Sequence, residues 1–140
     1  MSYLLDTCVL LEFSRRRPPD EHVINWLDNI DEDRLFLSVI SIGEIQHSIE
    51  RLPDSRRKNE LLTWLNDSLI ERFRGRILNV DVATFVLWGS LTARREVSGQ
   101  PLSVMDSLIA ASALHHELIL VTRNTADFLP YGIQLLNPWD

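Results

Sequence analysis

Five short apolar runs recur along the chain, and longer segments with helically spaced apolar positions separate them. The runs are rich in Leu, Ile and Val without alternating polar residues, and they cover residues 3–5, 35–39, 76–80, 118–122 and 133–136. Runs of this kind are typical of strands that are covered on both faces, as in a parallel sheet. The pattern therefore predicts five strands.

The segments between the runs predict the helices that connect parallel strands. Apolar positions at helical spacing cover residues 21–30, 42–52, 55–73, 82–97 and 104–117, and a shorter helical turn follows the first strand at residues 7–10. This alternation predicts an α/β protein: a three-layer α/β/α sandwich around a central, mainly parallel five-stranded sheet. No repeat or linker interrupts the pattern, so we expect one domain over residues 1–140.

Composition narrows the choice of partners and compartment. The chain has 14 Lys and Arg against 20 Asp and Glu, a formal net charge of −6, so it lacks a general basic coat and must bind any polyanion locally. Its only cysteine, Cys8, excludes an internal disulfide and favours a reducing compartment, which we take to be the cytoplasm. We expect neither export nor membrane insertion, because there is no positively charged leader and no apolar run approaches ~20 residues.

Acidic residues stand close to the ends of the predicted strands. Asp6 directly follows the first strand, Glu44 follows the second, and Asp127 follows the fourth, where Asn124 is a rival for the same role. Asp106 lies near the start of the last long helix. Ligands of parallel sheets bind at the carboxyl ends of the strands, near the point where the strand order reverses, so these side chains are candidates for one site.

Each acid also has an ordinary structural interpretation. Asp6 is a favoured helix-capping residue, and Ser41 and Ser103 each stand three residues before an acid, the spacing of a capping box that would put that acid in the first helical turn. Asn124 and Asp127 can form loop turns without any ligand. The residues alone leave both interpretations open. Asp81 follows the third strand, which we expect toward an edge of the sheet, and we interpret it as a cap.

Carboxylates that share one pocket need a compensating charge. Two of them repel by roughly 4 kcal/mol at 4 Å with an effective dielectric constant near 20. Either protons bind and raise some pKa values, or a hard divalent cation binds, and oxygen ligands favour Mg²⁺ or Mn²⁺ over zinc. We expect the cation, which can polarise a phosphodiester and activate a water molecule.

Five segments together resemble the PIN domain family, and more narrowly the VapC-type toxins of bacterial toxin–antitoxin pairs. In chain order they are residues 4–10 (LLDTCVL), 37–45 (LSVISIGEI), 106–111 (DSLIAA), 121–124 (VTRN) and 136–139 (LNPW). The resemblance implies a metal-dependent endoribonuclease that hydrolyses RNA. It also implies a homodimer that is restrained by a cognate antitoxin, whose tail would cover the acidic groove.

The resemblance assigns roles to particular residues. Asp6, Glu44 and Asp106 occupy the three main acidic positions of the family, and either Asn124 or Asp127 stands at the fourth. It implies that Asp6 and Asp106 bind the metal directly, that Glu44 binds metal or orients the attacking water, and that Asp127 with Asn124 completes the site.

Thr7 and Thr122 are expected to hold waters or carboxylates in place around these acids. Cys8 stands where the family usually has Asn, and we interpret it as a half-buried structural substitution rather than a nucleophile, because no histidine neighbours it in the sequence. The densest basic run, Arg15, Arg16 and Arg17, is either an RNA contact or a solvated turn.

Two other functions fit parts of the pattern. A phosphoacceptor signalling domain also places acids at strand ends, with Asp81 as acceptor, but the single lysine, Lys58, falls in a predicted helix. A non-catalytic protein-binding module would use the acids only as caps. The four tryptophans are expected in the core or at a protein interface, with none at the carboxyl edge of the sheet: Trp26, Trp64, Trp88 and Trp139.

Overall fold

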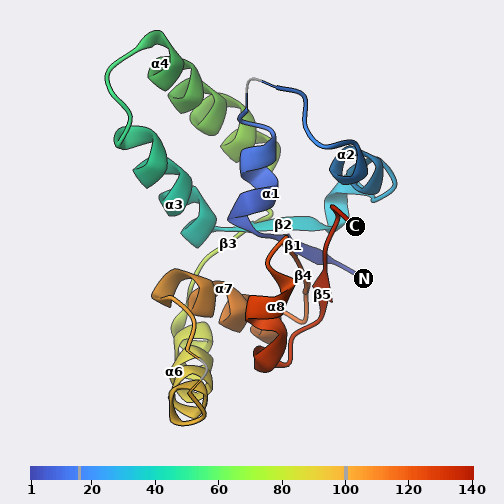
Figure 1. The fold of residues 1–140 in the computed structure, drawn as a ribbon, viewed down its shortest axis with the longest axis vertical. Coiled ribbons are helices and arrows are strands. Elements are labelled where there is room, and N and C mark those ends of the chain that lie inside the picture. Colours follow the sequence, from blue (N-terminus) through green and yellow to red (C-terminus); the bar gives the residue numbers. More distant parts are fainter. Residues whose placement is uncertain (16, 100) are drawn as a thin grey trace.

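In the described residues, five parallel strands form one sheet at the centre of the molecule, in the order β3-β2-β1-β4-β5 (Figure 1). The computed structural model describes residues 1–15, 17–99 and 101–140. The strands are β1 (Tyr3–Leu5), β2 (Leu35–Ser38), β3 (Ile77–Leu78), β4 (Ile119–Val121) and β5 (Leu135–Leu136). Each lies within its predicted run, which confirms the parallel five-stranded sheet.

The strand order reverses beside the first strand. Tyr3 of β1 pairs with Leu35 of β2 on one side and with Ile119 of β4 on the other. The chain runs outward from β1 through β2 to β3, which lies at the edge as expected, and then returns to place β4 on the opposite side of β1. The carboxyl ends of β1 and β4 therefore form the crevice in which sheets of this type bind ligands.

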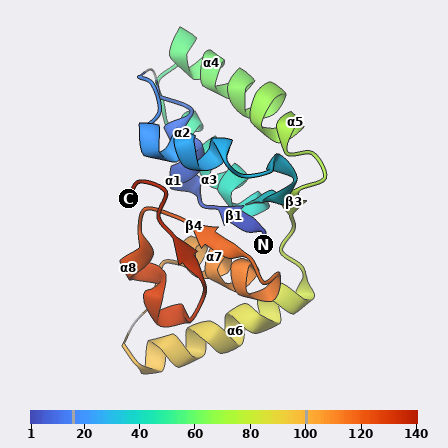
Figure 2. The same ribbon diagram turned by 90° about the vertical axis from the view of Figure 1, so that its right-hand side faces the viewer.

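One face of the sheet is covered by the helices of the first half of the chain (Figures 1 and 2). These are α1 (Thr7–Glu12), α2 (Glu21–Asp28), η1 (Glu32–Arg34), α3 (Val39–Glu50), α4 (Arg56–Thr63), η2 (Trp64–Leu69) and α5 (Ile70–Arg72). Leu5, Leu37 and Ile45 are buried in the apolar core between this layer and the sheet. The predicted helix over residues 55–73 is the continuous run from α4 to α5, with η2 as a π-helical middle segment.

The opposite face is covered by α6 (Val82–Val97), α7 (Val104–His115), α8 (Thr125–Phe128) and the 3₁₀ turn η3 (Leu129–Tyr131). Leu4 and Leu120 bury their side chains in this second core together with Phe128, because successive residues of a strand point to opposite faces. Trp88 ties α6 to α7, since its Nε1 donates to Ser107 Oγ at 2.8 Å. The three-layer α/β/α architecture is confirmed.

The start of α3 differs from the prediction. The helix begins at Val39 rather than Ile42, and its cap is Ser38, whose side chain accepts a hydrogen bond from the backbone N–H of Ile40 at 3.1 Å. The predicted capping box from Ser41 to Glu44 is therefore wrong, and Glu44 lies in the second helical turn. Ser38 is the last residue of β2, so the chain changes from strand to helix without an intervening loop. No helix in the described part of the chain has the length and apolarity needed to cross a membrane.

Candidate active site

Asp6 lies at the centre of the crevice, immediately after β1. Its side chain is only 4% exposed, and its backbone N–H donates to the Val121 carbonyl at 3.0 Å, which extends the pairing of β1 with β4. One carboxylate oxygen, Oδ1, accepts a hydrogen bond from the backbone N–H of Thr7 at 2.8 Å and caps α1. The other, Oδ2, accepts from the Thr122 hydroxyl at 2.8 Å. Asp6 is thus a cap and is also held from the end of β4.

Glu44 reaches the same region from α3. The Thr7 hydroxyl donates to Glu44 Oε1 at 2.7 Å and lies 2.9 Å from the Ser41 hydroxyl. Because Thr7 is the first residue of α1, this contact joins the end of β1 to α3. The structure therefore brings Asp6, Thr7 and Glu44 together, as expected for a common site.

Asp106 and Asp127 approach from the other layer. Asp106 is half-buried in the first turn of α7, where its backbone N–H donates to the capping Ser103 hydroxyl at 3.3 Å, so that predicted cap is confirmed. Asp127 lies exposed in α8, and its backbone N–H donates to the Asn124 carbonyl at 3.1 Å. The Asn124 side chain is exposed, while its backbone N–H donates to the Thr122 hydroxyl at 3.1 Å.

The four acids form one electrostatic cluster. Burial raises the pKa of Asp6, and the charges of Asp106 and Glu44 raise it further, against the opposing hydrogen bonds from Thr122 and Thr7. Burial also raises the pKa of Asp106, and the charge of Asp127 adds to this effect. The charges of Glu44 and Asp106 therefore act on Asp6, and the charge of Asp127 acts on Asp106, so the four side chains form a series. We call these four residues the acidic cluster.

The donor atoms of the acidic cluster suit a hard divalent cation, because they are carboxylate oxygens whose repulsion a cation would relieve. In the described residues, however, no three acidic, histidine or cysteine side chains stand close enough to form a ready-made metal site. The chemistry of the side chains fits a cation, and the side chains would have to converge further to bind it.

Cys8 lies beside Asp6 and is half-buried, as expected. Its Sγ is 3.9 Å from Asp6 Oδ2 and 3.7 Å from the Thr122 hydroxyl. Burial raises the pKa of the thiol, and the neighbouring Asp6 carboxylate raises it further, so the sulfur is protonated at neutral pH. A protonated thiol is a weak donor to the Asp6 carboxylate and a poor nucleophile.

One side chain of the basic run pairs with an acid of α1. Arg15 Nη1 lies 3.5 Å from Glu12 Oε1, at the end of α1. Arg17 is exposed, and Arg16 lies outside the described residues.

Three residues near the acidic cluster were not identified as functional from the sequence. Glu12 is a buried acid on α1, and Arg123 stacks on Trp139 with 4.1 Å between its Cζ and the ring centroid. Trp139 follows β5 by three residues, so the expectation that no tryptophan lies at the carboxyl edge is wrong. A signal for Glu12 was present, since it is the only charged residue in the apolar segment Val9 to Phe13.

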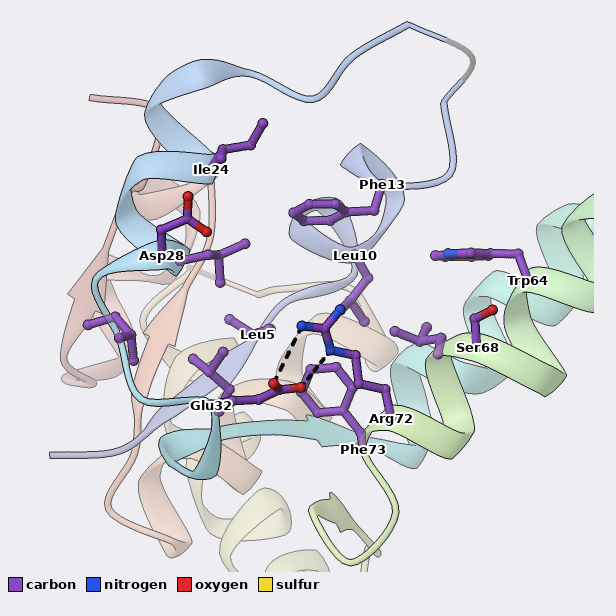
Figure 3. A pocket seen from close by; sticks show the side chains of 14 residues that line it. Leu5, Leu10, Phe13, Ile24, Asp28, Glu32, Trp64, Ser68, Arg72 and Phe73 are labelled. Atoms are coloured by element: carbon purple, nitrogen blue, oxygen red, sulfur yellow. Dashed lines mark hydrogen bonds and ion pairs between the residues drawn. The ribbon is translucent and has the colours of Figure 1, made fainter.

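A separate apolar pocket of about 450 Å³ lies between α1, α2 and η2 (Figure 3). Phe13, Leu10 and Trp64 are among its lining residues. Arg72 and Glu32 also line it, and the ion pair between Arg72 Nε and Glu32 Oε1 is 2.6 Å long. None of the four acids lines this pocket. Its lining suits an apolar group, whereas the chemistry of the acidic cluster lies at the crevice.

The profile of the PIN domain family matches residues 3–129, a range that includes the whole acidic cluster. The chain belongs to the PIN domain family. Among its relatives, this PIN domain is 33% identical to the plasmid stability protein StbB of Pseudomonas syringae pv. tomato, with 98% of each chain covered. It is 32% identical to the toxin FitB of Neisseria gonorrhoeae, with 97% of each chain covered.

A third relative is the VapC ribonuclease Y4jK of Sinorhizobium fredii, which is 29% identical over 98% of this PIN domain and 97% of the relative. Among solved structures, FitAcB from Neisseria gonorrhoeae superposes with a TM-score of 0.90 at 32% identity, covering 98% of each chain. The similarity therefore extends over the whole fold and is not confined to the motifs.

Proposed function

We propose that this PIN domain is the ribonuclease toxin of a toxin–antitoxin pair and cleaves RNA internally with the help of a divalent metal ion. The observation that carries the proposal is the buried Asp6 carboxylate, which lies at the reversal of strand order and whose pKa is raised by burial and by Asp106 and Glu44. A toxin and a VapC ribonuclease among the relatives support the same activity.

Mg²⁺ or Mn²⁺ is the cation that we propose for the site, because its ligands would be carboxylate oxygens. Asp6 and Asp106 would bind it directly, and Asp127 with Asn124 would complete its surroundings. When bound, such a cation polarises a phosphodiester oxygen and lowers the pKa of a bound water.

Two threonines of the chain would orient the carboxylates around that cation. Thr122 holds Asp6 Oδ2 at 2.8 Å, and Thr7 holds Glu44 Oε1 at 2.7 Å, so both carboxylates enter the site in fixed directions. Glu44 would bind the metal or orient the attacking water toward the phosphorus. No protein nucleophile is required, which agrees with the protonated thiol of Cys8.

We assign the apolar pocket beside α1 to the antitoxin. Phe13 is 42% exposed at its rim, and an apolar side chain of a partner would remove it from water. Since α1 is capped by Asp6, a segment that fills this pocket lies one helix away from the acidic cluster. The proposal places the protein in the cytoplasm, because its single cysteine requires no oxidising compartment.

A homodimer is also part of the proposal, and we assign its interface to the first turns of α6. Val82, Phe85 and Val86 expose 80%, 48% and 65% of their surface there. A second copy of the chain would bury this apolar face.

The activity is tested by incubating the purified protein with total cellular RNA and Mn²⁺, with and without a chelator, and then mapping the cut ends. We expect chelator-sensitive cleavage by the wild type and none by Asp6→Asn or Asp106→Asn. Asp81→Asn is the matched control. Asp81 also caps a helix, but it follows the edge strand β3 and accepts its hydrogen bonds from Thr84. Full cleavage by Asp6→Asn would refute the proposal and favour the protein-binding module.

A further inference from the structure

Glu12 is an acid in an unusual environment. It is 3% exposed at the end of α1, and its Oε2 has no hydrogen-bond partner among the described residues. Two arginines approach it instead: Arg15 Nη1 lies 3.5 Å from Oε1, and Arg123 Nη2 lies 4.0 Å from Oε2. A buried carboxylate is unfavourable unless cations compensate it, so Glu12 draws both guanidinium groups toward one point.

The two arginines come from segments that are far apart in the sequence. Arg15 follows α1, whereas Arg123 lies in the loop between β4 and α8. Their side chains remain 39% and 46% exposed, so each guanidinium group keeps donors that face solvent. The three side chains carry a net charge of +1 in a protein whose net charge is −6.

Arg123 is also fixed from a second side. Its guanidinium group lies over the Trp139 ring at 4.1 Å, a cation–π contact. A guanidinium group that is held by both a carboxylate and an aromatic ring loses less conformational freedom when it binds a ligand. Arg123 is therefore preorganised, and its direction depends on Glu12 and Trp139.

Arg123 lies next in sequence to residues that contact the acidic cluster. The preceding residue, Thr122, holds the Asp6 carboxylate at 2.8 Å, and the following residue is Asn124. The positive charge of Arg123 also reaches Cys8, whose sulfur lies 3.9 Å from Asp6 Oδ2. A chain of RNA that brings one phosphate to Asp6 would thus pass its neighbouring phosphates close to Arg123.

We propose that Glu12, Arg15 and Arg123 form a clamp for RNA phosphates beside the acidic cluster. Arg15 and Arg123 are substrate-binding residues, and Glu12 is a positioning residue that acts through them. Arginine suits this role because its planar fork binds phosphate oxygens in pairs. The proposal rests on the ribonuclease function proposed above, and it supplies the local cations that a negatively charged protein needs to attract RNA.

The first test compares Arg15→Ala and Arg123→Ala with Arg74→Ala. Arg74 is a matched control, since it is exposed and paired with Glu71 at 2.5 Å but lies before β3, at the opposite edge of the sheet. For RNA cleavage with Mn²⁺, we expect each clamp variant to raise KM about tenfold with little change in kcat, because phosphate contacts act in binding. Arg74→Ala should match the wild type in both constants.

The second test measures binding without cleavage, so that the two proposals can fail separately. In an Asp6→Asn background, a fluorescein-labelled single-stranded RNA is titrated by anisotropy at several salt concentrations. Loss of one phosphate contact should reduce the slope of log K against log salt by about 0.7. If the wild type cleaves RNA but neither arginine changes KM, Kd or this slope, the clamp is refuted. If RNA is never cleaved but binds through these arginines, the clamp stands and the ribonuclease proposal fails.

The third test concerns Glu12. We expect Glu12→Gln to raise KM in the wild type and to have no further effect once Arg15 and Arg123 are both alanine, since Glu12 acts only through them. A purely structural role would instead lower thermal stability and kcat equally in both backgrounds. That outcome would overturn the positioning role of Glu12. Arg15→Ala and Arg123→Ala, which replace exposed side chains, would still test the clamp itself.

Discussion

The hydrogen bond from Thr122 to Asp6 can be tested by replacing the hydroxyl with a methyl group. Thr122→Val keeps the size of a side chain that is 0% exposed and removes the donor that lies 2.8 Å from Asp6 Oδ2. A hydrogen bond to a charged group contributes ~1.5 to 3 kcal/mol, and losing it leaves a carboxylate that is almost fully buried without that donor. The Thr122 hydroxyl also accepts from the Asn124 backbone N–H at 3.1 Å, and Asn124 is an exposed residue, so we expect water to replace that second bond at little cost.

We therefore expect Thr122→Val to lower the free energy of unfolding by about 2 kcal/mol at neutral pH, in urea melts with a chelator present. That loss corresponds to a decrease in Tm of roughly 4 to 8 °C for a protein of this size. The bond favours the charged form of Asp6, so its loss raises the pKa of Asp6 beyond the value that burial already sets. The stability difference between variant and wild type should therefore shrink as pH is lowered through the pKa of Asp6.

Two further variants control this experiment. Thr122→Ser keeps the hydroxyl and should retain the pH dependence of the wild type. Thr84→Val is the matched control outside the site, because Thr84 is also 0% exposed and donates to the Asp81 carboxylate at 2.7 Å. It should weaken the cap of α6 without changing Mn²⁺ affinity. Equal stability and equal Mn²⁺ affinity of Thr122→Val and Thr122→Ser would refute the assigned contribution of this bond.

Three other expectations follow from the same geometry. Because the pKa values of Asp6 and Asp106 are raised, their contribution to stability is present at acidic pH and is lost as pH rises through those values, so the Tm measured with a chelator should fall over that range. Mn²⁺ should stabilise the protein more at pH 7 than at pH 5. The raised pKa of Cys8 predicts slow alkylation by iodoacetamide at neutral pH, and a rate equal to that of a free thiol would contradict it. Val86→Glu places a charge on the exposed face of α6 and should shift the protein toward monomer in sedimentation experiments, while an unchanged mass would exclude that face as the dimer interface.

Local sequence patterns determined most of the secondary structure. The five apolar runs contain the five strands of the described residues, and the caps at Asp81 and Ser103 lie where their sequence neighbours predicted them. These features depend on residues that are close in the chain: the periodicity of apolar side chains, and polar groups that can accept from the first N–H groups of a helix. The motifs around Asp6, Glu44 and Asp106 likewise identified the family.

The start of α3 required the tertiary structure. The sequence predicted Ser41 as the cap of that helix, because an acid follows it at capping-box spacing, whereas the observed cap is Ser38. In the fold, Ser38 pairs with Leu78, the last residue of β3, so the ladder between β2 and β3 ends there and the helix starts at the next residue. The pairing of distant strands therefore overrode a local signal.

The arrangement around the acids also depended on tertiary structure. The sequence placed Asp6 at a strand end, but the reversal of strand order between β1 and β4 is what brings Thr122 to its carboxylate. Glu12 and Arg123 approach each other from nearly opposite ends of the chain, and no periodicity or spacing reports such a contact. Local patterns determine where strands and helices form, whereas the packing of distant segments decides which charges meet.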